Sequence, residues 1–523
     1  FNFPVWGMLE KCAVNWLAGM PAIVKPATVT SFLAEAVAAD IIGSGILPEG
    51  ALQIICGSAG DLLDHVNYQD VVTFTGSAST GLKLKSHPNI LKESVPFNME
   101  ADSLNCIVLA RDAAPGTPEF EVFVKEIRRE MTVKCGQKCT AVRRILVPGQ
   151  YIDDVQEAIG KSLAGTPIGD PRVQGVRMGA LAGKDQVEEV RAKISELAAF
   201  SDIVYGDPDD FEVSMGSREK GSYLAPVLLR NNQPHIHEGS HEIEAFGPVA
   251  TIMPYDDLED AVLLARKGKG SLCSSIVTFD DGIARDYVVS AATHHGRILV
   301  LNRESAVEST GHGSPMPLLI HGGPGRAGGG EEMGGMRGVK HYMQRCAIQG
   351  TPTTLTAVTQ QYQYGGKYHL DTIHPFKKYF EDLVVGETLI THKRTVTESD
   401  IVNFANVSWD HFYAHTDATS LEGTTFTQRV AHGYFVLSAA AGLFVDAAKG
   451  PVLLNYGLEE CRFTKPVYPG MTIGVRLTVK EKVAQEKRDD EDYRKGIVKW
   501  LVDVYDETGE TVAIATILTM VKM

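Results

Sequence analysis

Apolar side chains recur at helical spacing before residue 132, and charged residues fill the positions between them. The apolar positions are Phe120, Phe123, Val124, Ile127 and Met131. Gly136 is expected to end this helix, and the β-prone run 141–147 follows it. The pattern places Cys139 on a short connection between a helix and a strand, where a nucleophile is accessible to a ligand.

Helical and strand patterns alternate through the first part of the chain. Helices are expected at 5–19, at 30–42 and near 60–66, and strands at 22–26, 52–57 and 71–74. This order implies a parallel sheet with right-handed crossovers, in which ligands bind at the carboxyl ends of the strands. Gly76 follows the third strand and opens a helix, a setting in which backbone N–H groups hold a phosphate. A stray turn is the alternative, because the spacing matches neither common phosphate-binding fingerprint.

The pattern changes after residue 345. Residues 346–375 are rich in Thr, Gln, Tyr and Gly without sustained periodicity, and they are predicted to be a linker. Further strands are expected at 388–396, 461–463, 471–482, 497–505 and 512–521. An unusually apolar helix at 434–445 is expected to be buried in their sheet. The sequence therefore predicts an α/β domain at 1–345 and an α+β domain at 376–523.

The bulk composition is that of a globular protein. The chain has 523 residues, of which 44% are hydrophobic and 22% charged, and its net charge of −15 argues against nonspecific binding of nucleic acid. The sequence lacks an apolar run of about 18 residues, so no membrane span is expected. Eight unevenly spaced cysteines fit a reducing cytosol. The first residues, 1–7, are typical of the middle of a domain, so an N-terminal part of the native chain is expected to be missing.

Cys139 is the candidate nucleophile. The thiolate is the reactive form, and basic neighbours at Lys134, Lys138 and Arg143 are expected to favour it. The alternative interpretation is a buried structural thiol. Cys135 and Cys139 could also form half of a zinc site, but no second Cys/His pair with suitable spacing lies nearby, so no metal is expected.

Short segments resemble the aldehyde dehydrogenase superfamily over residues 1 to about 345. They are N-F-P at 2–4, K-P-A at 25–27, F-T-G-S at 74–77, the Cys139 segment and E-A-F-G-P-V at 244–249. The resemblance implies a Rossmann-like cofactor part and a catalytic part. A glycine-rich stretch at 320–330 lacks a following Lys-Ser/Thr, which excludes a nucleotide P-loop.

The same resemblance assigns roles to residues. Cys139 would attack an aldehyde, Asn2 and the Cys139 N–H would stabilise the oxyanion, and Glu100 would activate water. The family's acid-bearing segment is E-L-G-G-K, and the glycines are missing after Glu100 here. The implied cofactor contacts are Lys25 and Glu244 at ribose groups, Gly76 and Ser77 at the pyrophosphate, and Phe246 at the nicotinamide.

Residues 376–523 resemble the hot-dog fold of MaoC-like, (R)-specific enoyl-CoA hydratases. Asp410 and His415 have the spacing of that family's catalytic pair, and Ala431-His432-Gly433 matches its helix-entry motif. The resemblance implies that the pair activates water, and that the Gly433 N–H polarises a thioester carbonyl. A turn Asp beside a surface His is the alternative. His411 and His432 are expected to serve packing or hydrogen bonding.

The fusion of the two families resembles bifunctional ring-opening enzymes. It implies hydrolysis of a CoA thioester, oxepin-CoA, to a semialdehyde, which is then oxidised with NADP in the cytoplasm. It also implies a homo-oligomer, a hexamer built from dimers. Two alternatives stay open: a generic enoyl-CoA hydratase fused to a fatty-aldehyde dehydrogenase, and a scaffold with an inactive first domain.

Overall fold

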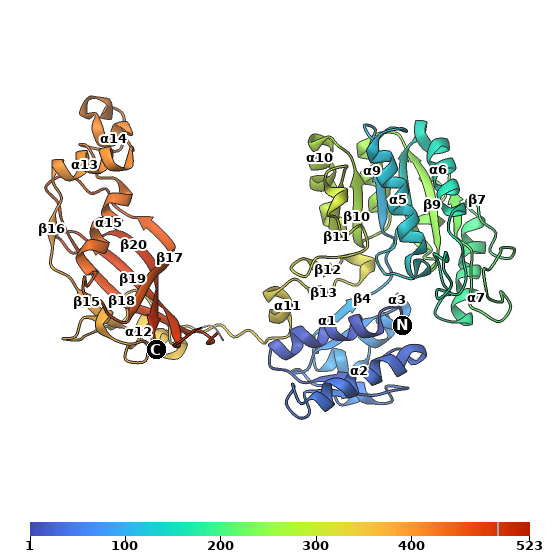
Figure 1. The fold of residues 1–523 in the computed structure, drawn as a ribbon, viewed down its shortest axis with the longest axis horizontal. Coiled ribbons are helices and arrows are strands. Elements are labelled where there is room, and N and C mark those ends of the chain that lie inside the picture. The colour runs from blue at the N-terminus through green and yellow to red at the C-terminus, as the bar shows by residue number, and fades with distance from the viewer. Residues whose placement is uncertain (489–490) are drawn as a thin grey trace. The chain divides into compact units, whose positions relative to one another are not determined.

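The computed structural model describes residues 1–488 and 491–523, and the chain forms two compact units, Phe1–Arg345 and Cys346–Met523 (Figure 1). Each unit has its own hydrophobic core. None of the helices in these described ranges combines the length and apolarity needed to cross a bilayer.

A seven-stranded sheet forms the centre of the larger part of the first unit, in the order β11-β10-β5-β6-β9-β8-β7. Its strands are β5 (Cys106–Leu109), β6 (Arg144–Pro148), β7 (Asp202–Tyr205), β8 (Val227–Arg230), β9 (Val249–Tyr255), β10 (Ser271–Val277) and β11 (His295–Leu301). All neighbours pair in parallel except β7 with β8. The strands on which the parallel-sheet expectation was based, at 22–26, 52–57 and 71–74, lie outside this sheet and form separate two-stranded parallel pairs.

Helices cover both faces of this sheet, as a parallel sheet requires. They are α5 (Pro118–Thr132), α6 (Ile152–Ala164), α9 (Leu258–Arg266) and α10 (Asp281–Ala291), together with α7 (Lys184–Ala198) and α8 (Gly239–Glu242). Phe123 and Ile127 of α5 and Ile159 of α6 are buried in one core cluster, and Leu264 and Tyr287 of α9 and α10 are buried in another. The apolar stripe that predicts α5 is thus the stripe that packs on the sheet.

Short elements form the remainder of the first unit. They are α1 (Pro4–Leu17), β1 (Ala22–Val24), α2 (Ser31–Ser44), β2 (Leu52–Ile54), β3 (Val72–Thr75), α3 (Ala78–Lys85), α4 (Pro88–Lys92), β4 (Phe97–Glu100), β12 (Ile320–Gly322), β13 (Glu331–Met333) and α11 (Met336–His341). β1 pairs with β2 and β3 with β4, both in parallel, whereas β12 and β13 are antiparallel. These elements follow the expected alternation, although the helix expected near 60–66 is a single 3₁₀ turn at Leu62–Asp64.

The glycine-rich stretch is a tight connection between β12 and β13 that packs on the end of β4. The Ala101 N–H donates to the Ala327 carbonyl, and the Gly330 N–H donates to the Met99 carbonyl, both at 3.0 Å. A Cβ on Gly328 would lie 2.3 Å from the Met99 oxygen, and one on Gly330 would lie 2.5 Å from it. The glycines therefore permit a close backbone approach rather than phosphate binding.

The second unit is a sheet wrapped against one helix, and its strands pair antiparallel except for the parallel pair β14–β15. Its strand order is β14-β15-β18-β19-β20-β17, and β16 pairs with β18. The strands are β14 (His369–Leu370), β15 (Glu387–Ile390), β16 (Arg394–Thr395), β17 (Val452–Phe463), β18 (Thr472–Ala484), β19 (Lys495–Tyr505) and β20 (Thr511–Lys522). The helices are α12 (Pro352–Thr359), α13 (Glu398–Ser408), α14 (Tyr413–Thr416) and α15 (Gly433–Phe444). Trp500 and residues of α15 belong to the same core cluster, and this arrangement confirms the hot-dog expectation.

Two expectations for the second unit need correction. Residues 346–375 are not an irregular linker, because α12 and β14 lie within them and the Tyr362 N–H donates to the Lys480 carbonyl at 2.8 Å. The Thr351 side chain accepts from the Thr354 N–H and caps α12, which is why that helix forms. The helix at 434–445 is not buried all round, since Tyr434 is 71% exposed.

Candidate functional site

The connection that carries Cys139 has an unusual backbone. Residues 134–136 take φ values of 52°, 56° and 66°, three successive left-handed conformations just after α5. The Asn105 side chain then donates to the carbonyl oxygens of Cys139 at 2.8 Å and Ala141 at 3.0 Å. These bonds fix the position of the thiol between α5 and β6, as the sequence pattern predicts.

Cys139, Glu100 and His321 meet in the interior of the first unit. The His321 Nε2 atom lies 3.8 Å from the Cys139 Sγ and 3.2 Å from Glu100 Oε2. Glu100 ends β4 and His321 is the middle residue of β12, and only 2% and 7% of their respective surfaces are exposed. The site thus brings a thiol, a carboxylate and an imidazole close together where water has little access. Such a site is suited to nucleophilic and acid–base chemistry.

Burial and charge shift the ionisation of this cluster. Burial, followed by the Glu100 carboxylate, raises the pKa of the Cys139 thiol well above its ordinary value. Burial alone would lower the pKa of His321, but the Glu100 carboxylate outweighs it and raises that pKa to about 9. The Glu100 pKa is lowered, because His321 outweighs the desolvation that would raise it. At neutral pH the cluster therefore holds an imidazolium, a carboxylate and a thiol.

The basic neighbours of the cysteine do not act as expected. Lys138 Nζ lies 2.6 Å from Glu130 Oε1 in a buried ion pair. Arg143 donates to the carbonyl oxygens of Gly136 and Gly247 at 2.8 and 2.6 Å. The expectation that these cations lower the pKa of the thiol is wrong, because they are bonded elsewhere and a carboxylate faces the sulfur.

A second group of charges lies behind the cluster. Lys11 Nζ lies 2.8 Å from Glu332 Oε1, and carboxylate oxygens of Glu10, Glu100 and Glu332 lie within 4.8 Å of one another. Burial raises the pKa of Glu332 to about 8 although Lys11 acts to lower it. The Lys11 ammonium, which is paired with Glu332, offsets part of the repulsion among the three acids.

Residues expected at the cofactor lie on several elements. Glu244 follows α8; its Oε1 has no hydrogen-bond partner among the described residues and lies 3.8 Å from the Arg143 Nε. Burial raises the pKa of Glu244 to about 7. The Phe246 ring packs edge-on against Phe1, with centroids 5.8 Å apart.

Four further candidates lie at element ends. The Ser77 side chain caps α3, and the Gly76 N–H donates to the Glu100 carbonyl at 3.1 Å, which ties the β3–α3 turn to the acid. Lys25 is exposed just after β1. The Asn2 carbonyl accepts from Lys134 Nζ at 3.0 Å, which joins the start of the chain to the nucleophile connection.

The candidate site of the second unit contains one more imidazole than expected. Polar atoms of Asp410, His415 and His432 lie within 4.8 Å of one another. His415 Nδ1 lies 2.6 Å from the Val430 carbonyl, and His432 Nε2 lies 2.9 Å from the Asp410 carbonyl. These bonds leave His415 Nε2 and His432 Nδ1 as acceptors. His432 is thus a hydrogen-bonding residue, as expected, but it also belongs to the Asp410 cluster.

Gly433 begins α15 beside this cluster. A Cβ at this position would lie 2.5 Å from the Phe463 ring, so the ring packs directly on the backbone of the first helical turn. The N–H groups of that turn point out of the helix at its positive end.

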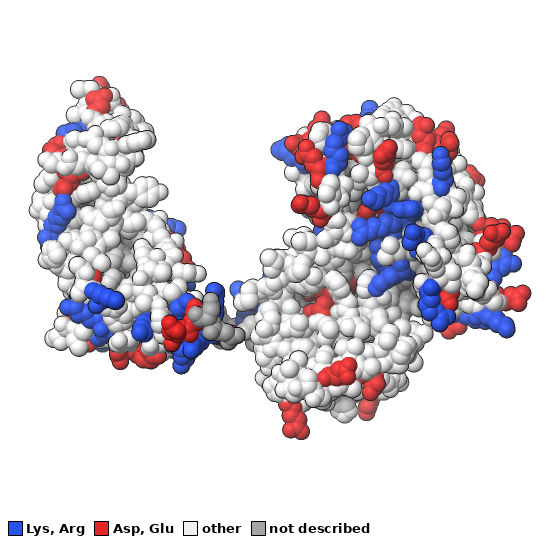
Figure 2. Space-filling model, in the orientation of Figure 1, with Lys and Arg blue, Asp and Glu red and all other residues white. Residues whose placement is uncertain are grey.

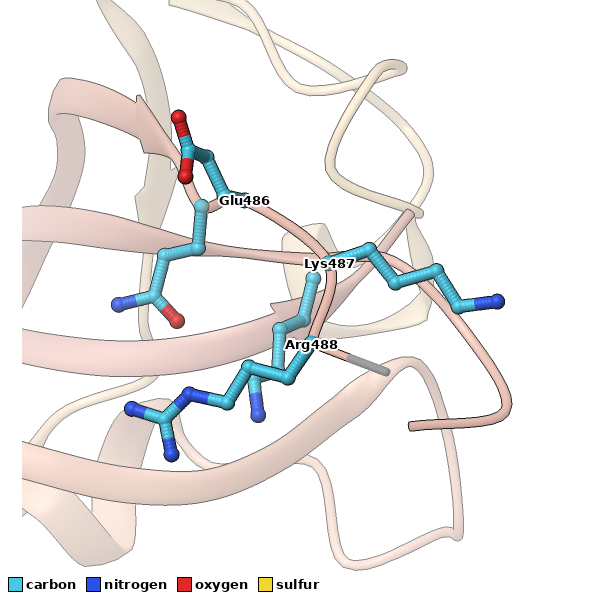
Figure 3. A pocket seen from close by; sticks show the side chains of 5 residues that line it. Glu486, Lys487 and Arg488 are labelled. Carbon is cyan, nitrogen blue, oxygen red and sulfur yellow. The ribbon is translucent and has the colours of Figure 1, made fainter. Parts of the chain in front are cut away.

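Neither His321 nor the proximity of His432 to the Asp410–His415 pair was expected from the sequence. A signal for His321 is present in the sequence, since an imidazole directly follows the apolar residues 318–320 at the start of the glycine-rich stretch. A surface recess of about 360 Å³ lies at the connection between β18 and β19 (Figure 3). Its lining consists of Gln485, Glu486, Lys487, Arg488 and Lys495. No predicted site residue lines it, and no function is assigned to it.

Comparisons with known proteins agree with both units. Residues 1–348 match the aldehyde dehydrogenase family, and residues 382–500 match the MaoC like domain. Protein MaoC of Klebsiella aerogenes is 52% identical over 312 residues, which cover 60% of this chain and 91% of that protein. The 3,4-dehydroadipyl-CoA semialdehyde dehydrogenase of Aromatoleum evansii is 46% identical over 324 residues, 62% of this chain and 63% of that one. The chain thus spans less than two thirds of the second relative.

Solved structures support the fold. Aldehyde dehydrogenase C of Pseudomonas syringae, in complex with NAD+ and octanal, aligns with a TM-score of 0.57 and 22% identity over 66% of this chain and 67% of that one. A succinic semialdehyde dehydrogenase of Streptococcus pyogenes with NADP+ aligns with a TM-score of 0.58 and 18% identity over 67% and 71%.

The chain belongs to the aldehyde dehydrogenase family. In it, an aldehyde dehydrogenase domain is fused to a MaoC-like domain.

Proposed function

We propose that the protein cleaves a ring in two steps, as a bifunctional oxepin-CoA hydrolase and 3-oxo-5,6-dehydrosuberyl-CoA semialdehyde dehydrogenase. The second unit opens oxepin-CoA hydrolytically, and the first oxidises the resulting semialdehyde with NADP. The contact of Cys139 with the His321–Glu100 pair supports this most directly, since it joins a nucleophile to an acid–base pair. The relative named a CoA-semialdehyde dehydrogenase supports the substrate class.

The residues present fit a nicotinamide dinucleotide. Glu244 Oε1 is buried without a hydrogen-bond partner among the described residues, as expected of an oxygen that accepts from a ribose hydroxyl. Lys25 is exposed just after β1, and Ser77 caps α3 at a strand-to-helix turn. When bound, the dinucleotide supplies the acceptor for the hydride.

An anionic CoA thioester needs local positive charge in a chain of net charge −15. Arg128 and Arg129 lie three and four positions after Lys125 on α5, and the exposed Lys134 lies two residues after the end of the helix. Lys and Arg side chains gather over α5 (Figure 2). This basic face leads to the nucleophile connection and supports binding of the CoA phosphates there.

Oxidation begins at Cys139. Its sulfur loses a proton and forms a bond to the aldehyde carbon, and the resulting oxyanion is stabilised by the Asn2 amide and the Cys139 N–H. Hydride departure from that carbon leaves a thioester. The proton lost by the sulfur passes to solvent. Glu100 in its ionised form then takes a proton from water, the hydroxide attacks the thioester carbon, and the C–S bond breaks to release the acid and the thiolate.

Ring opening takes place at Asp410 and His415. His415 Nδ1–H donates to the Val430 carbonyl, so its Nε2 can accept a proton from water held by Asp410. The hydroxyl adds to the enol-ether carbon next to the ring oxygen, and the proton is delivered to the other carbon of the double bond. The hemiacetal then breaks its ring C–O bond, giving an aldehyde and an enol that becomes a ketone. The Gly433 N–H polarises the thioester carbonyl.

The protein is proposed to act in the cytoplasm as a homo-oligomer, a hexamer built from dimers. Two dimer contacts on one chain, one from each family, would close such an assembly. Coupling both activities in one chain shortens the lifetime of a reactive free aldehyde.

Mass spectrometry of oxepin-CoA incubated with the protein tests this function. Without cofactor we expect a product heavier by one water, and with NADP+ the corresponding acid. Cys139→Ala should stop the reaction at the semialdehyde, and Asp410→Asn should stop ring opening but not oxidation of supplied semialdehyde. Preference for simple enoyl-CoA and fatty aldehydes would favour the generic fusion, and oxidation that survives Cys139→Ala would favour the scaffold.

A further inference from the structure

We propose that His321 is a further catalytic residue of the first unit: its imidazolium contacts both Cys139 and Glu100 and stabilises the negative charge that moves between sulfur and carboxylate. This inference rests on the proposed role of Cys139 as nucleophile. It adds a third member to a site that was otherwise expected to work through a thiol and one acid.

The geometry provides the first argument. One atom, His321 Nε2, lies 3.2 Å from Glu100 Oε2 and 3.8 Å from the Cys139 Sγ. A single N–H therefore faces both groups between which a proton must move. All three side chains are buried or half-buried, so water competes little for these contacts.

The strand holds the imidazole in place. His321 pairs with Glu332 in the β12–β13 register, and the glycine-rich turn between these strands packs on β4, which ends at Glu100. The imidazole and the carboxylate are thus mounted on two segments whose backbones are hydrogen-bonded to each other. A preorganised ion pair of this kind needs no rearrangement when charge moves.

Charge balance explains why the site needs a cation. A Cys139 thiolate beside an ionised Glu100 would place two negative charges together in a buried site, and this repulsion raises the pKa of the thiol. Instead the Sγ–H bond breaks and the proton moves to Glu100, whose Oε1 has no other hydrogen-bond partner among the described residues. The single negative charge lies on Glu100 before this transfer and on the Cys139 sulfur after it, and the His321 imidazolium contacts both groups.

The surrounding groups keep His321 charged. Glu332 and Glu10 add to the effect of Glu100 and raise the pKa of His321 to about 9 in spite of burial. Lys11, from α1, is paired with Glu332. The imidazolium is therefore present below about pH 9 and is lost above it.

Alkylation of Cys139 by iodoacetamide measures directly how His321 affects the reactivity of the thiol, because the reaction needs neither aldehyde nor cofactor. The rate at Cys139 is followed by peptide mass spectrometry from pH 5 to 10. We expect the wild-type rate to be nearly flat from about pH 6 to 8, since proton transfer within the cluster leaves its total charge unchanged. In His321→Gln the rate at pH 7 should fall by about tenfold and climb steeply toward pH 10, as for an ordinary buried thiol.

Two further variants define the outcome. His321→Lys keeps a positive charge and should restore part of the rate at pH 7, whereas His341→Gln in α11 is the control and should match the wild type. Equal rates for wild type and His321→Gln would overturn the proposal. If His321→Gln does not fold, the wild-type profile decides: a rate that rises only above about pH 9 would also overturn it.

The alkylation result is independent of the proposed substrate. If the alkylation rate changes in His321→Gln as expected but the protein fails to oxidise CoA-linked semialdehydes, the proposed function is rejected and the role of His321 is kept. If the rate does not change in His321→Gln but the protein oxidises these semialdehydes, the role of His321 is rejected and the proposed function is kept.

Discussion

The imidazole rings of His415 and His432 stack with their centroids 3.8 Å apart and their planes inclined by 27°. Two positive charges cannot share this stack cheaply, and burial together with His415 lowers the pKa of His432 although its bond to the Asp410 carbonyl opposes this shift. His432 thus remains neutral at neutral pH, and its hydrogen bond to the Asp410 carbonyl holds the loop that carries Asp410.

Replacement of His432 by Ala is therefore expected to lower the kcat of ring opening by about tenfold or more, because the Asp410 loop and His415 lose their support. Oxidation of supplied semialdehyde should not change. His411→Ala is the matched control, since His411 is an exposed histidine of the same loop. An equal loss of kcat in His432→Ala and His411→Ala would contradict this prediction, because it would show that any substitution in the loop impairs ring opening.

The buried ion pair of Lys138 and Glu130 joins the connection that carries Cys139 to α5. Lys138→Met would leave the Glu130 carboxylate buried and unpaired, at a cost of about 3–5 kcal/mol in the free energy of unfolding. Chemical denaturation measures this loss. Lys125→Met removes an exposed lysine of α5 and should change stability by less than about 0.5 kcal/mol. Adding Glu130→Leu to Lys138→Met should recover much of the loss, and a double variant no more stable than the single one would contradict the pairing.

Cofactor affinity should depend on pH through Glu244. Burial raises the pKa of this carboxyl to about 7, so it is largely protonated below pH 7 and cannot accept from a ribose hydroxyl as an anion. The dissociation constant for NADP+, measured by calorimetry, should therefore increase as the pH falls from 8 to 6. Glu244→Gln should bind weakly at every pH, whereas the exposed neighbour variant Glu242→Gln should keep the wild-type profile. A wild-type profile that is flat across pH 7 would contradict this assignment.

The glycine-rich turn offers a steric test of how Glu100 is positioned. Gly328 and Gly329 both have positive φ, but a Cβ on Gly328 would lie 2.3 Å from the Met99 carbonyl, and a Cβ on Gly329 would meet nothing within 4 Å. Both Ala variants carry backbone strain, of about 1–2 kcal/mol. Gly328→Ala should in addition displace the end of β4 and slow the release of the acyl enzyme.

Pre-steady-state absorbance of NADPH checks this prediction. Gly328→Ala should give a burst of one equivalent followed by a slower steady state than in Gly329→Ala. Identical time courses for the two variants would mean that the close backbone approach does not determine the position of the acid.

Much of this architecture follows from local pattern. The apolar stripe of α5 and the β-prone run after it place Cys139 correctly, and Thr397 with Asp400 forms a capping box at the start of α13, a motif that is legible in the sequence. Such features depend on neighbours a few residues apart, which a sequence displays directly.

Other features depend on contacts that no local pattern contains. Lys138 was expected to face the thiol, but its partner Glu130 lies eight residues earlier, on the helix before the turn. The helix α15 offers mostly Ala, Gly and aromatic positions, so its hydrophobicity could not show that Tyr434 faces outward. The first part of β17 was also missed, because Asn455 and Gly457 interrupt its alternation.

The distance along the chain between His321 and Cys139, 182 residues, has a consequence for biosynthesis. The ribosome synthesises Cys139 long before His321, so the growing polypeptide contains the thiol without the imidazolium that increases its reactivity. Reactivity toward cellular electrophiles is thereby delayed until β12 has been translated and has joined β4.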